Sequence, residues 1–358
     1  MKGLNIVGRS VGVRTTLPVL SNILLKTEKG GLKLSATDLE VGITTWIGAK
    51  VDQEGAITVP AKLLVEYINS NRDKTINLDL KEISLNLSSE HYKADIKGID
   101  AQEFPLIPTV KKASAIEIRG DVFARAIDKV LIAVASDESR PVLAGIYLTA
   151  KDNTLKIVAT DSYRLAEQKI TLEKKIEGEV NLIIPQRPMA EVARILRDGV
   201  EHVVIYPGEN QVEFVLGETT LVSRLIEGVF PDYTQIIPKA PKITMTAKSP
   251  EFNNAIKMAS LFARESANNI KVKLSEPDKI EIIAISPHLG GNTSRVTGSV
   301  KGGVIEIAFN AKFVLDVIAI LGGDAINLSL TDNVTAGMVT SPQDKDYLYI
   351  IMPLRVDE

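Results

Sequence analysis

Cysteine is absent from the 358 residues of this chain, which excludes disulfide bonds and thiolate metal sites. A chain without cysteine suits a reducing cytosol, so we predict a cytoplasmic protein. No apolar run reaches the roughly 18 residues needed to span a bilayer. The first residues also lack the basic and apolar segments of a secretory signal. We therefore expect no membrane partner.

Positive charge is not in excess either. The chain has 42 Lys and Arg against 45 Asp and Glu, a net charge of −3. Proteins that grip DNA by neutralising phosphates usually show a basic excess. Nucleic acid is therefore either not a partner, or it is held by something other than tight electrostatic contact.

Recognisable catalytic patterns are missing as well. The three histidines, His91, His202 and His288, stand in no metal-ligand or triad spacing. We find no paired acids, nucleophile elbow or dinucleotide fingerprint. The sequence thus predicts no catalytic residue, no metal ligand and no cofactor.

An internal repeat is the strongest positive signal. The triplet Ala36-Thr37-Asp38 recurs as Ala159-Thr160-Asp161, 123 positions later, and each copy ends an alternating apolar run. An acid at the end of a strand usually caps a turn. A true repeat also predicts that the flanking segments recur at about the same spacing.

The flanking segments do recur. A strand followed by an amphipathic helix is predicted at 57–68, 183–196 and 307–321, and a strand hairpin follows each one at 76–87, 203–216 and 326–338. Proline-bearing linkers separate the copies. We predict three α+β domains, 1–109, 110–240 and 241–358, each with two helices against an antiparallel sheet.

The first copy is shorter than the second. Leu4, Ile6 and Val7 resemble the back half of a helix, and the strand predicted at 116–118 in the second copy has no counterpart before them. We expect that the natural protein either begins upstream of Met1 or compensates for the lost strand.

Several short segments match one family in order and spacing. They are Thr16–Leu20, Ala36–Glu40, Arg140–Leu143, Ala159–Asp161, Phe230–Tyr233 and Met352–Arg355. Over essentially its whole length the chain resembles the bacterial DNA polymerase III β subunits, the sliding clamps.

The resemblance implies a head-to-tail homodimer that closes into a ring, with helices lining the hole. Such a ring encircles duplex DNA without sequence preference and tethers the replicative polymerase. It implies a processivity factor with no active site of its own. The implied partners are double-stranded DNA, a second copy, the clamp loader, the DNA polymerase III α subunit and other proteins that carry a clamp-binding motif. A topological link needs few phosphate contacts, which accounts for the low positive charge.

The resemblance also implies a groove for short client peptides of the Gln-Leu-x-Leu-Phe kind. Its residues would come from the second and third domains and the linker between them: Leu143, Thr160, Ser162, Tyr163, Arg164, Leu165, Pro231, Ile236, Val334, Ile350, Met352, Pro353, Leu354 and Arg355.

Other family positions map onto charged and apolar residues. DNA contacts are expected at Arg14, Lys62, Arg140 and Arg187, and the net positive helix at 187–197 adds Arg194 and Arg197. The dimer interface is expected to place Leu261 and Phe262 against Ile96 of the other copy.

Two other classes of function stay open. The chain would be a peptide-binding adaptor if it were monomeric, because a monomer cannot close this ring. It would be an enzyme if Asp38 and Asp161 were completed by partner acids or a metal.

Overall fold

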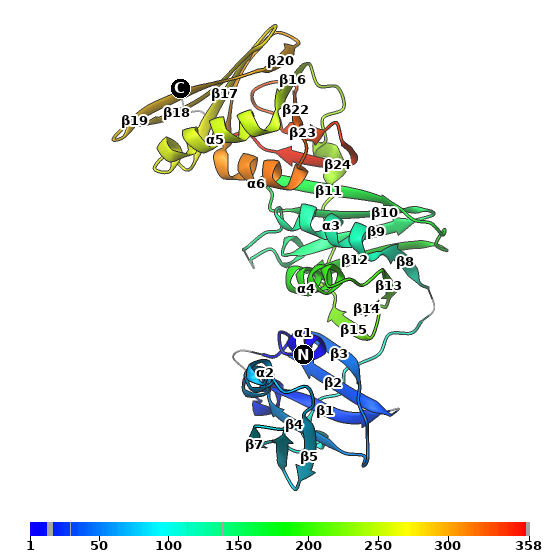
Figure 1. Ribbon diagram of the computed structural model, residues 1–358. Coiled ribbons are helices and arrows are strands. Elements are labelled where there is room, and N and C mark those ends of the chain that lie inside the picture. Colours follow the sequence, from blue (N-terminus) through cyan, green and yellow to red (C-terminus); the bar gives the residue numbers. More distant parts are fainter. Residues whose placement is uncertain (13–16, 29, 113, 138, 356–358) are drawn as a thin grey trace. The chain divides into compact units, whose positions relative to one another are not determined.

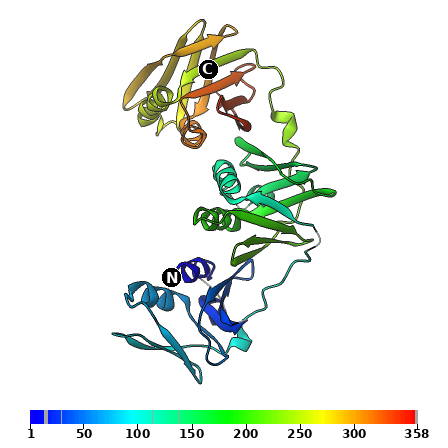
Figure 2. The ribbon, with the colours of Figure 1, turned by 45° about the vertical axis from the view of Figure 1, so that its right-hand side comes forward.

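The computed structural model describes residues 1–12, 17–28, 30–112, 114–137 and 139–355. The chain divides into two compact units. Unit 1 holds Met1–Ala124 with Arg187–Leu225, and unit 2 holds Arg125–Gln186 with Ile226–Glu358. Each unit is built around one long antiparallel sheet (Figures 1 and 2). No helix within the described ranges is long and apolar enough to cross a membrane.

Unit 1 contains the first repeat and part of the second. Its elements are α1 (Lys2–Val7), β1 (Asn22–Glu28), β2 (Gly31–Thr37), β3 (Val41–Gly48), β4 (Ala56–Pro60), α2 (Ala61–Ser70), β5 (Asn77–Lys81), β6 (Ser84–Ser88), β7 (Lys93–Lys97), β8 (Ile116–Arg119), α4 (Gln186–Arg197), β13 (His202–Pro207), β14 (Gln211–Leu216) and β15 (Thr219–Arg224). The strands form an eight-stranded sheet, β4-β1-β2-β3-β15-β14-β13-β8, and a small sheet, β5-β6-β7.

Unit 2 contains the rest of the second repeat and the third. Its elements are β9 (Gly145–Lys151), β10 (Thr154–Thr160), β11 (Arg164–Thr171), β12 (Glu179–Pro185), β16 (Ile243–Lys248), α5 (Ser249–Ala263), β17 (Asn269–Ser275), β18 (Lys279–Ser286), β19 (Gly290–Val296), β20 (Gly298–Lys301), β21 (Val304–Asn310), α6 (Ala311–Leu321), β22 (Ala325–Leu330), β23 (Gly337–Ser341) and β24 (Asp344–Ile351). Helix α3 (Gly120–Leu131) begins in unit 1 and ends in unit 2.

The sheets of unit 2 follow the same plan as those of unit 1. One runs β12-β9-β10-β11-β24-β23-β22-β16-β20, and the other runs β19-β18-β17-β21. Helices α5 and α6 lie side by side in the third repeat (Figures 1 and 2).

Strand pairing joins neighbouring repeats in the same way twice. In unit 1, β3 of the first repeat pairs with β15 of the second, with Ile43 opposite Leu221. In unit 2, β11 of the second repeat pairs with β24 of the third, with Leu165 opposite Ile350. The sheets therefore run across the boundaries expected near residues 109 and 240, and the second repeat is shared between the two units.

The predicted helix faces form cores. Met189, Val192, Ala193 and Leu196 are all buried on α4, as their helical spacing predicts. The same spacing on α6 buries Val314, Val317 and Ile318.

The shortened first repeat is visible in the small sheet of unit 1. Leu4, Ile6 and Val7 are buried on α1, as expected. Strands β8 and β16 cover the outer edges of β13 and β22. Within the described residues no strand covers the outer edge of β5, and all five residues of β5 are exposed.

Candidate functional site

The second repeated triplet forms a tight turn after β10. One carboxylate oxygen of Asp161 accepts hydrogen bonds from the backbone N–H groups of Tyr163 and Arg164, both at 2.9 Å. Between them Ser162 has a φ of 77°, in the left-handed region. An aspartate that satisfies the N–H groups two and three residues later holds such a turn. The predicted capping role is confirmed.

The first triplet forms the same turn after β2. Asp38 accepts from the N–H groups of Glu40 at 3.1 Å and Val41 at 2.8 Å, and Leu39 has a φ of 75°. The second oxygen of Asp38 is bonded by Arg187 at 2.5 Å.

Asp161 uses its second oxygen likewise, accepting a bond from Arg164 Nε at 2.9 Å. Both carboxylates, Asp38 and Asp161, therefore have each oxygen engaged in a hydrogen bond or an ion pair. This geometry does not support the catalytic alternative.

A third copy of the turn has no aspartate. Ser286, at the end of β18, accepts from the N–H groups of His288 at 3.2 Å and Leu289 at 3.0 Å. The segment Ala284-Ile285-Ser286, about one repeat length after Ala159-Thr160-Asp161, could have indicated this turn in the sequence. Serine can replace aspartate here because its hydroxyl oxygen accepts the same two bonds.

Three residues expected in the peptide groove lie together in unit 2. Leu143, Leu165 and Ile350 are at most 5% exposed and belong to one apolar cluster. Phe230 and Tyr233 from the linker pack in the same cluster. Residues from separate segments of the chain therefore meet as predicted, but they form buried support rather than exposed surface.

Exposed groups lie beside this cluster. Met352 is half-buried and packs against the cluster, and its N–H donates to the carbonyl oxygen of Tyr163 at 2.8 Å. The Tyr163 side chain is largely exposed. Thr160 is buried, and its hydroxyl donates to the carbonyl of Arg164 at 2.7 Å.

The remaining predicted groove residues are more scattered. Val334 and Ile236 are exposed, in the loop before β23 and in a short 3-10 turn of the linker. Ser162, Pro231 and Arg355 are exposed, while Pro353 and Leu354 are half-buried. The N–H of Leu354 donates to the carbonyl of Ala308 at 2.8 Å, which fixes the last described residues against β21.

Arg164 has a structural role that the sequence did not indicate. Its side chain is 10% exposed and bonds to Asp316 on α6 at 2.5 Å. Its guanidinium also stacks over the ring of Phe313, 4.2 Å from the centroid. Burial opposes the charge, but Tyr349 and the bonds to Asp316 and Asp161 outweigh it and raise the pKa of Arg164 above its ordinary value. Arg164 therefore ties the turn after β10 to the third repeat.

The predicted DNA contacts belong to both units. Arg14 lies outside the described residues. Lys62 is exposed in the first turn of α2, and Arg140 donates to the hydroxyl of Ser162 at 3.0 Å.

Helix α4 holds the other three candidates. Arg187, Arg194 and Arg197 are all exposed. Arg187 pairs with Asp38, and Arg194 pairs with Glu191 at 3.3 Å. The charges of Arg187 and Arg194 are therefore partly neutralised within unit 1.

The predicted interface residues differ in exposure. Leu261 is 46% exposed and Phe262 is half-buried, both near the end of α5. Ile96 is only 3% exposed, because its side chain on β7 packs inside unit 1. The expected contact of Leu261 and Phe262 with Ile96 lies between two copies and stays a prediction.

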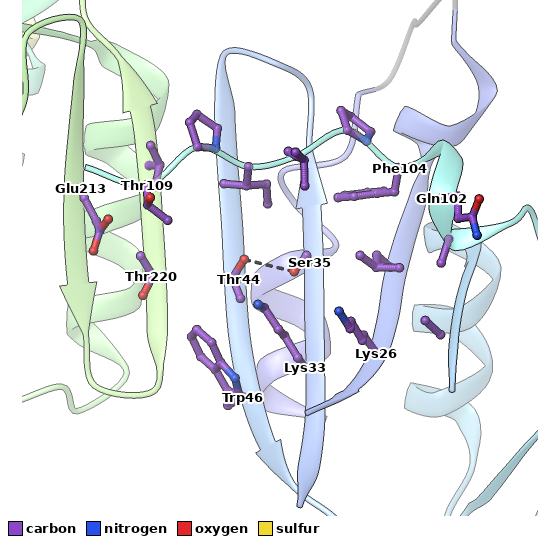
Figure 3. A pocket seen from close by; sticks show the side chains of 18 of the residues that line it. Lys26, Lys33, Ser35, Thr44, Trp46, Gln102, Phe104, Thr109, Glu213 and Thr220 are labelled. Atoms are coloured by element: carbon purple, nitrogen blue, oxygen red, sulfur yellow. Dashed lines mark hydrogen bonds between the residues drawn. The ribbon is translucent and has the colours of Figure 1, made fainter. Parts of the chain in front are cut away.

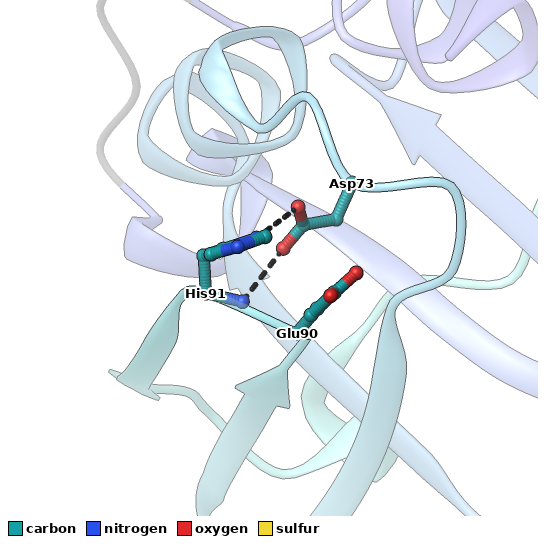
Figure 4. Close-up of side chains that lie close together, drawn as sticks. All are labelled: Asp73, Glu90 and His91. Carbon is teal, nitrogen blue, oxygen red and sulfur yellow. Dashed lines mark hydrogen bonds and ion pairs between the residues drawn. The ribbon is translucent and has the colours of Figure 1, made fainter.

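A cluster that the sequence spacing did not reveal lies in the first repeat (Figure 4). Ligand-type atoms of Asp73, Glu90 and His91 all lie within 4.8 Å of one another. The carboxylate of Asp73 accepts from the His91 N–H at 2.9 Å and lies 2.8 Å from its ring Nδ1. Hydrogen bonds from the Ser89 hydroxyl and from His91 lower the pKa of Asp73 to about 2. Asp73 thus braces the loop after α2 against the β6–β7 turn.

Comparison with known families matches all three repeats. The model of the DNA polymerase III beta subunit N-terminal domain matches residues 1–108, that of the central domain matches 117–232, and that of the C-terminal domain matches 234–355.

Individual relatives agree with these matches. A "Beta sliding clamp" of Staphylococcus aureus is 32% identical over 363 residues, covering 98% of this chain and 96% of its own length. The crystal structure of a DNA polymerase sliding clamp from Bacillus subtilis superposes with a TM-score of 0.94 at 29% identity, covering 99% of this chain and 97% of the other. The DNA polymerase III subunit beta from Pseudomonas aeruginosa gives a TM-score of 0.93 at 28% identity with the same coverage. The chain therefore belongs to the DNA polymerase III beta subunit family, the sliding clamps.

Proposed function

We propose that two copies of this chain close head to tail into a ring around duplex DNA and hold the replicative polymerase on it. Membership of the sliding-clamp family supports the function. The observation that carries the ring is the repeated way in which strands join one repeat to the next.

Each internal junction pairs corresponding strands. The third strand after the first helix of one repeat, β3 or β11, pairs with the last strand of the following repeat, β15 or β24. In the third repeat the corresponding third strand is β19, and in the first repeat the corresponding last strand is β7. Neither has a strand on its outer edge among the described residues.

A free strand edge exposes unpaired N–H and C=O groups and invites another strand. If the junction is used a third time, β19 of one copy pairs with β7 of the next. A chain whose two complementary edges lie in its last and first repeats assembles head to tail. Closure after two copies leaves neither the β19 edge nor the β7 edge free. Burial of the Ile96 side chain is compatible with this scheme, since the pairing uses the β7 backbone.

The charge distribution fits a topological hold on DNA. The net charge is −3, and the exposed arginines of α4 are partly paired with acids. Contacts of this kind give weak, non-specific attraction to phosphates. A closed ring needs no stronger attraction, because it can leave the DNA only at a free DNA end or when the ring opens.

We also propose that client proteins bind beside the apolar cluster of unit 2. Met352 and Tyr163 would flank the bound peptide, with Leu165 as buried support. Methionine suits a site shared by several partners, because its flexible side chain repacks at low cost. The clients would include the DNA polymerase III α subunit, the clamp loader and other proteins with the motif.

The deciding experiment loads the protein onto nicked circular duplex DNA with a clamp loader and then cuts the circle. We expect the protein to remain on the circle and to leave after cutting, and simple mixing with short duplexes to give weak binding that falls with salt. A native mass equal to twice 38.9 kDa should accompany this behaviour. Tight salt-resistant binding to short linear duplexes would point to an ordinary DNA-binding protein. A monomer that binds client peptides but is not retained on circles would point to an adaptor.

A further inference from the structure

Unit 1 carries a groove that neither the DNA contacts nor the client site uses (Figure 3). Its volume is about 580 Å³. Strands β1, β2, β3 and β15 form its floor, and the segment 104–109 crosses them as a wall. Leu24, Phe104 and Ile107 give this wall and floor an apolar character.

Two lysines and a tryptophan stand side by side on the floor. Lys26 on β1 lies directly opposite Lys33 on β2, and Lys33 lies opposite Trp46 on β3. Lys33 is partly neutralised by Glu28 at 3.1 Å and lies over the Trp46 ring, 5.2 Å from its centroid. Among the described residues the Lys26 ammonium has no hydrogen-bond or ion-pair partner. Like charges directly opposite each other destabilise a sheet, so an anion between them would be favourable.

The other end of the groove is already neutral. The carboxylate of Glu213 is 5% exposed, accepts from the Val110 N–H at 3.3 Å and pairs with Lys112 at 3.6 Å. The unbalanced positive charge is therefore confined to the end that holds Lys26 and Lys33.

Unit 2 shows what balances the corresponding place. The strand order β4-β1-β2-β3-β15 matches β12-β9-β10-β11-β24, so Lys156 stands where Lys33 does and Glu167 stands where Thr44 does. Lys156 pairs with Glu167 at 3.3 Å, and the hydroxyl of Tyr233 donates to the same carboxylate at 2.5 Å.

The two units differ in the group that balances this lysine. Unit 2 supplies a carboxylate from its own chain. Where unit 2 has Glu167, unit 1 has the uncharged Thr44, which shares a hydrogen bond of 3.1 Å with Ser35, and Lys33 pairs with Glu28 at 3.1 Å instead. It also has an additional lysine, Lys26, where unit 2 has Thr149.

We propose that this groove binds an acidic peptide segment of a partner protein. One carboxylate of the peptide lies between Lys26 and Lys33, in the place that Glu167 fills in unit 2. A neighbouring aromatic or aliphatic side chain packs against Trp46 and Phe104. Charge-assisted hydrogen bonds orient the segment, and the apolar contact adds affinity. The buried carboxylate of Glu213 and the apolar wall favour a peptide over a run of phosphates.

The test uses a pool of fluorescent peptides in which one aromatic or aliphatic residue is flanked on both sides by aspartate or glutamate. Anisotropy is measured with the full-length protein. Lys26→Thr copies the residue of unit 2 and should weaken binding by about tenfold, the value expected for one lost charge-assisted hydrogen bond. Thr44→Glu builds in the carboxylate of unit 2 and should weaken binding at least as much while leaving both lysines in place.

Matched controls separate this site from general charge effects. Lys50→Thr removes an equally positive side chain of unit 1 that does not line the groove and should leave the affinity unchanged. Met352→Ala should also leave it unchanged, so that failure of the client site and failure of this proposal can be told apart. No binding by the wild type, equal losses in Lys26→Thr and Lys50→Thr, or displacement of the pool by a short oligothymidylate would each overturn the proposal.

Discussion

The N–H of Met352 donates to the carbonyl of Tyr163 across 2.8 Å, although the two residues belong to different repeats. This bond extends the pairing of β11 with β24 by one residue and places an adaptable side chain beside an exposed aromatic one. It is the contact around which the proposed client site is built.

Shortening Met352 should weaken client binding. Peptide interfaces draw most of their energy from a few anchor contacts, so Met352→Ala should cost about 1–4 kcal/mol in affinity for a labelled Gln-Leu-Ser-Leu-Phe peptide. Fluorescence anisotropy measures the loss. Met258→Ala on α5, a methionine that is 44% exposed, serves as the control and should bind like the wild type. Equal affinities of wild type and Met352→Ala would remove this residue from the site.

A charge near the end of α5 should break the proposed ring. Leu261→Asp places a carboxylate in the expected interface, where an unpaired charge costs several kcal/mol, to order of magnitude. Sedimentation at micromolar concentration should show a monomer. Val304→Asp alters a more exposed apolar residue, on β21, and should remain dimeric. If Leu261→Asp sediments as a dimer, the interface lies elsewhere.

Loss of the Arg164–Asp316 pair should destabilise the fold. Asp316→Asn leaves the guanidinium of Arg164, which is 10% exposed, without one of its two carboxylates. We expect the free energy of unfolding to fall by about 1–3 kcal/mol, the usual range for a buried polar group that loses a partner. Urea denaturation measures it. Asp52→Asn breaks the exposed pair with Lys50 and should change stability by less than about 0.5 kcal/mol. Comparable effects of the two changes would contradict the structural role of Arg164.

The Asp73 cluster should contribute a pH-dependent part of the stability. The Asp73 pKa is lowered in the folded protein from 3.8 to about 2, first by the Ser89 hydroxyl and then by His91. A depressed pKa stabilises the fold above the unfolded value, and this contribution is lost as pH falls from about 3.8 to about 2. The melting temperature of the wild type should therefore exceed that of Asp73→Asn at pH 6. The difference between the two melting temperatures should narrow as the pH falls from about 3.8 to about 2. A difference in melting temperature that stays constant with pH would show that the carboxylate charge of Asp73 does not cause the added stability.

The repeat architecture could be predicted from the chain because it depends on local patterns. The alternation of apolar residues that ends at Asp38 and at Asp161 predicted where two strands end. The spacing of Met189, Val192 and Leu196 predicted a helix with one buried face. A capping aspartate accepts hydrogen bonds from the N–H groups two and three residues later. Because this interaction is local, it can be predicted from the sequence. The serine version at Ser286 was missed because serine is common and its capping is not specific.

Contacts between repeats were beyond such patterns. Nothing near Arg164 in sequence indicates Asp316, and nothing near Ile96 shows that its side chain turns inward. The first depends on how strands from separate repeats line up, and the second on the register of β7 against β6, since sheet register decides which face each side chain takes.

The residue types fixed where strands, turns and helices form, because period and turn chemistry are properties of consecutive residues. Which carboxylate pairs with each lysine was settled only by the fold. Lys33 and Lys156 occupy matching positions, but Lys156 pairs with Glu167 on the neighbouring strand, while Lys33 pairs with Glu28 because Thr44 stands in the place of Glu167. Charge balance depends on distances in space, and those distances are set by the pairing of strands far apart in sequence.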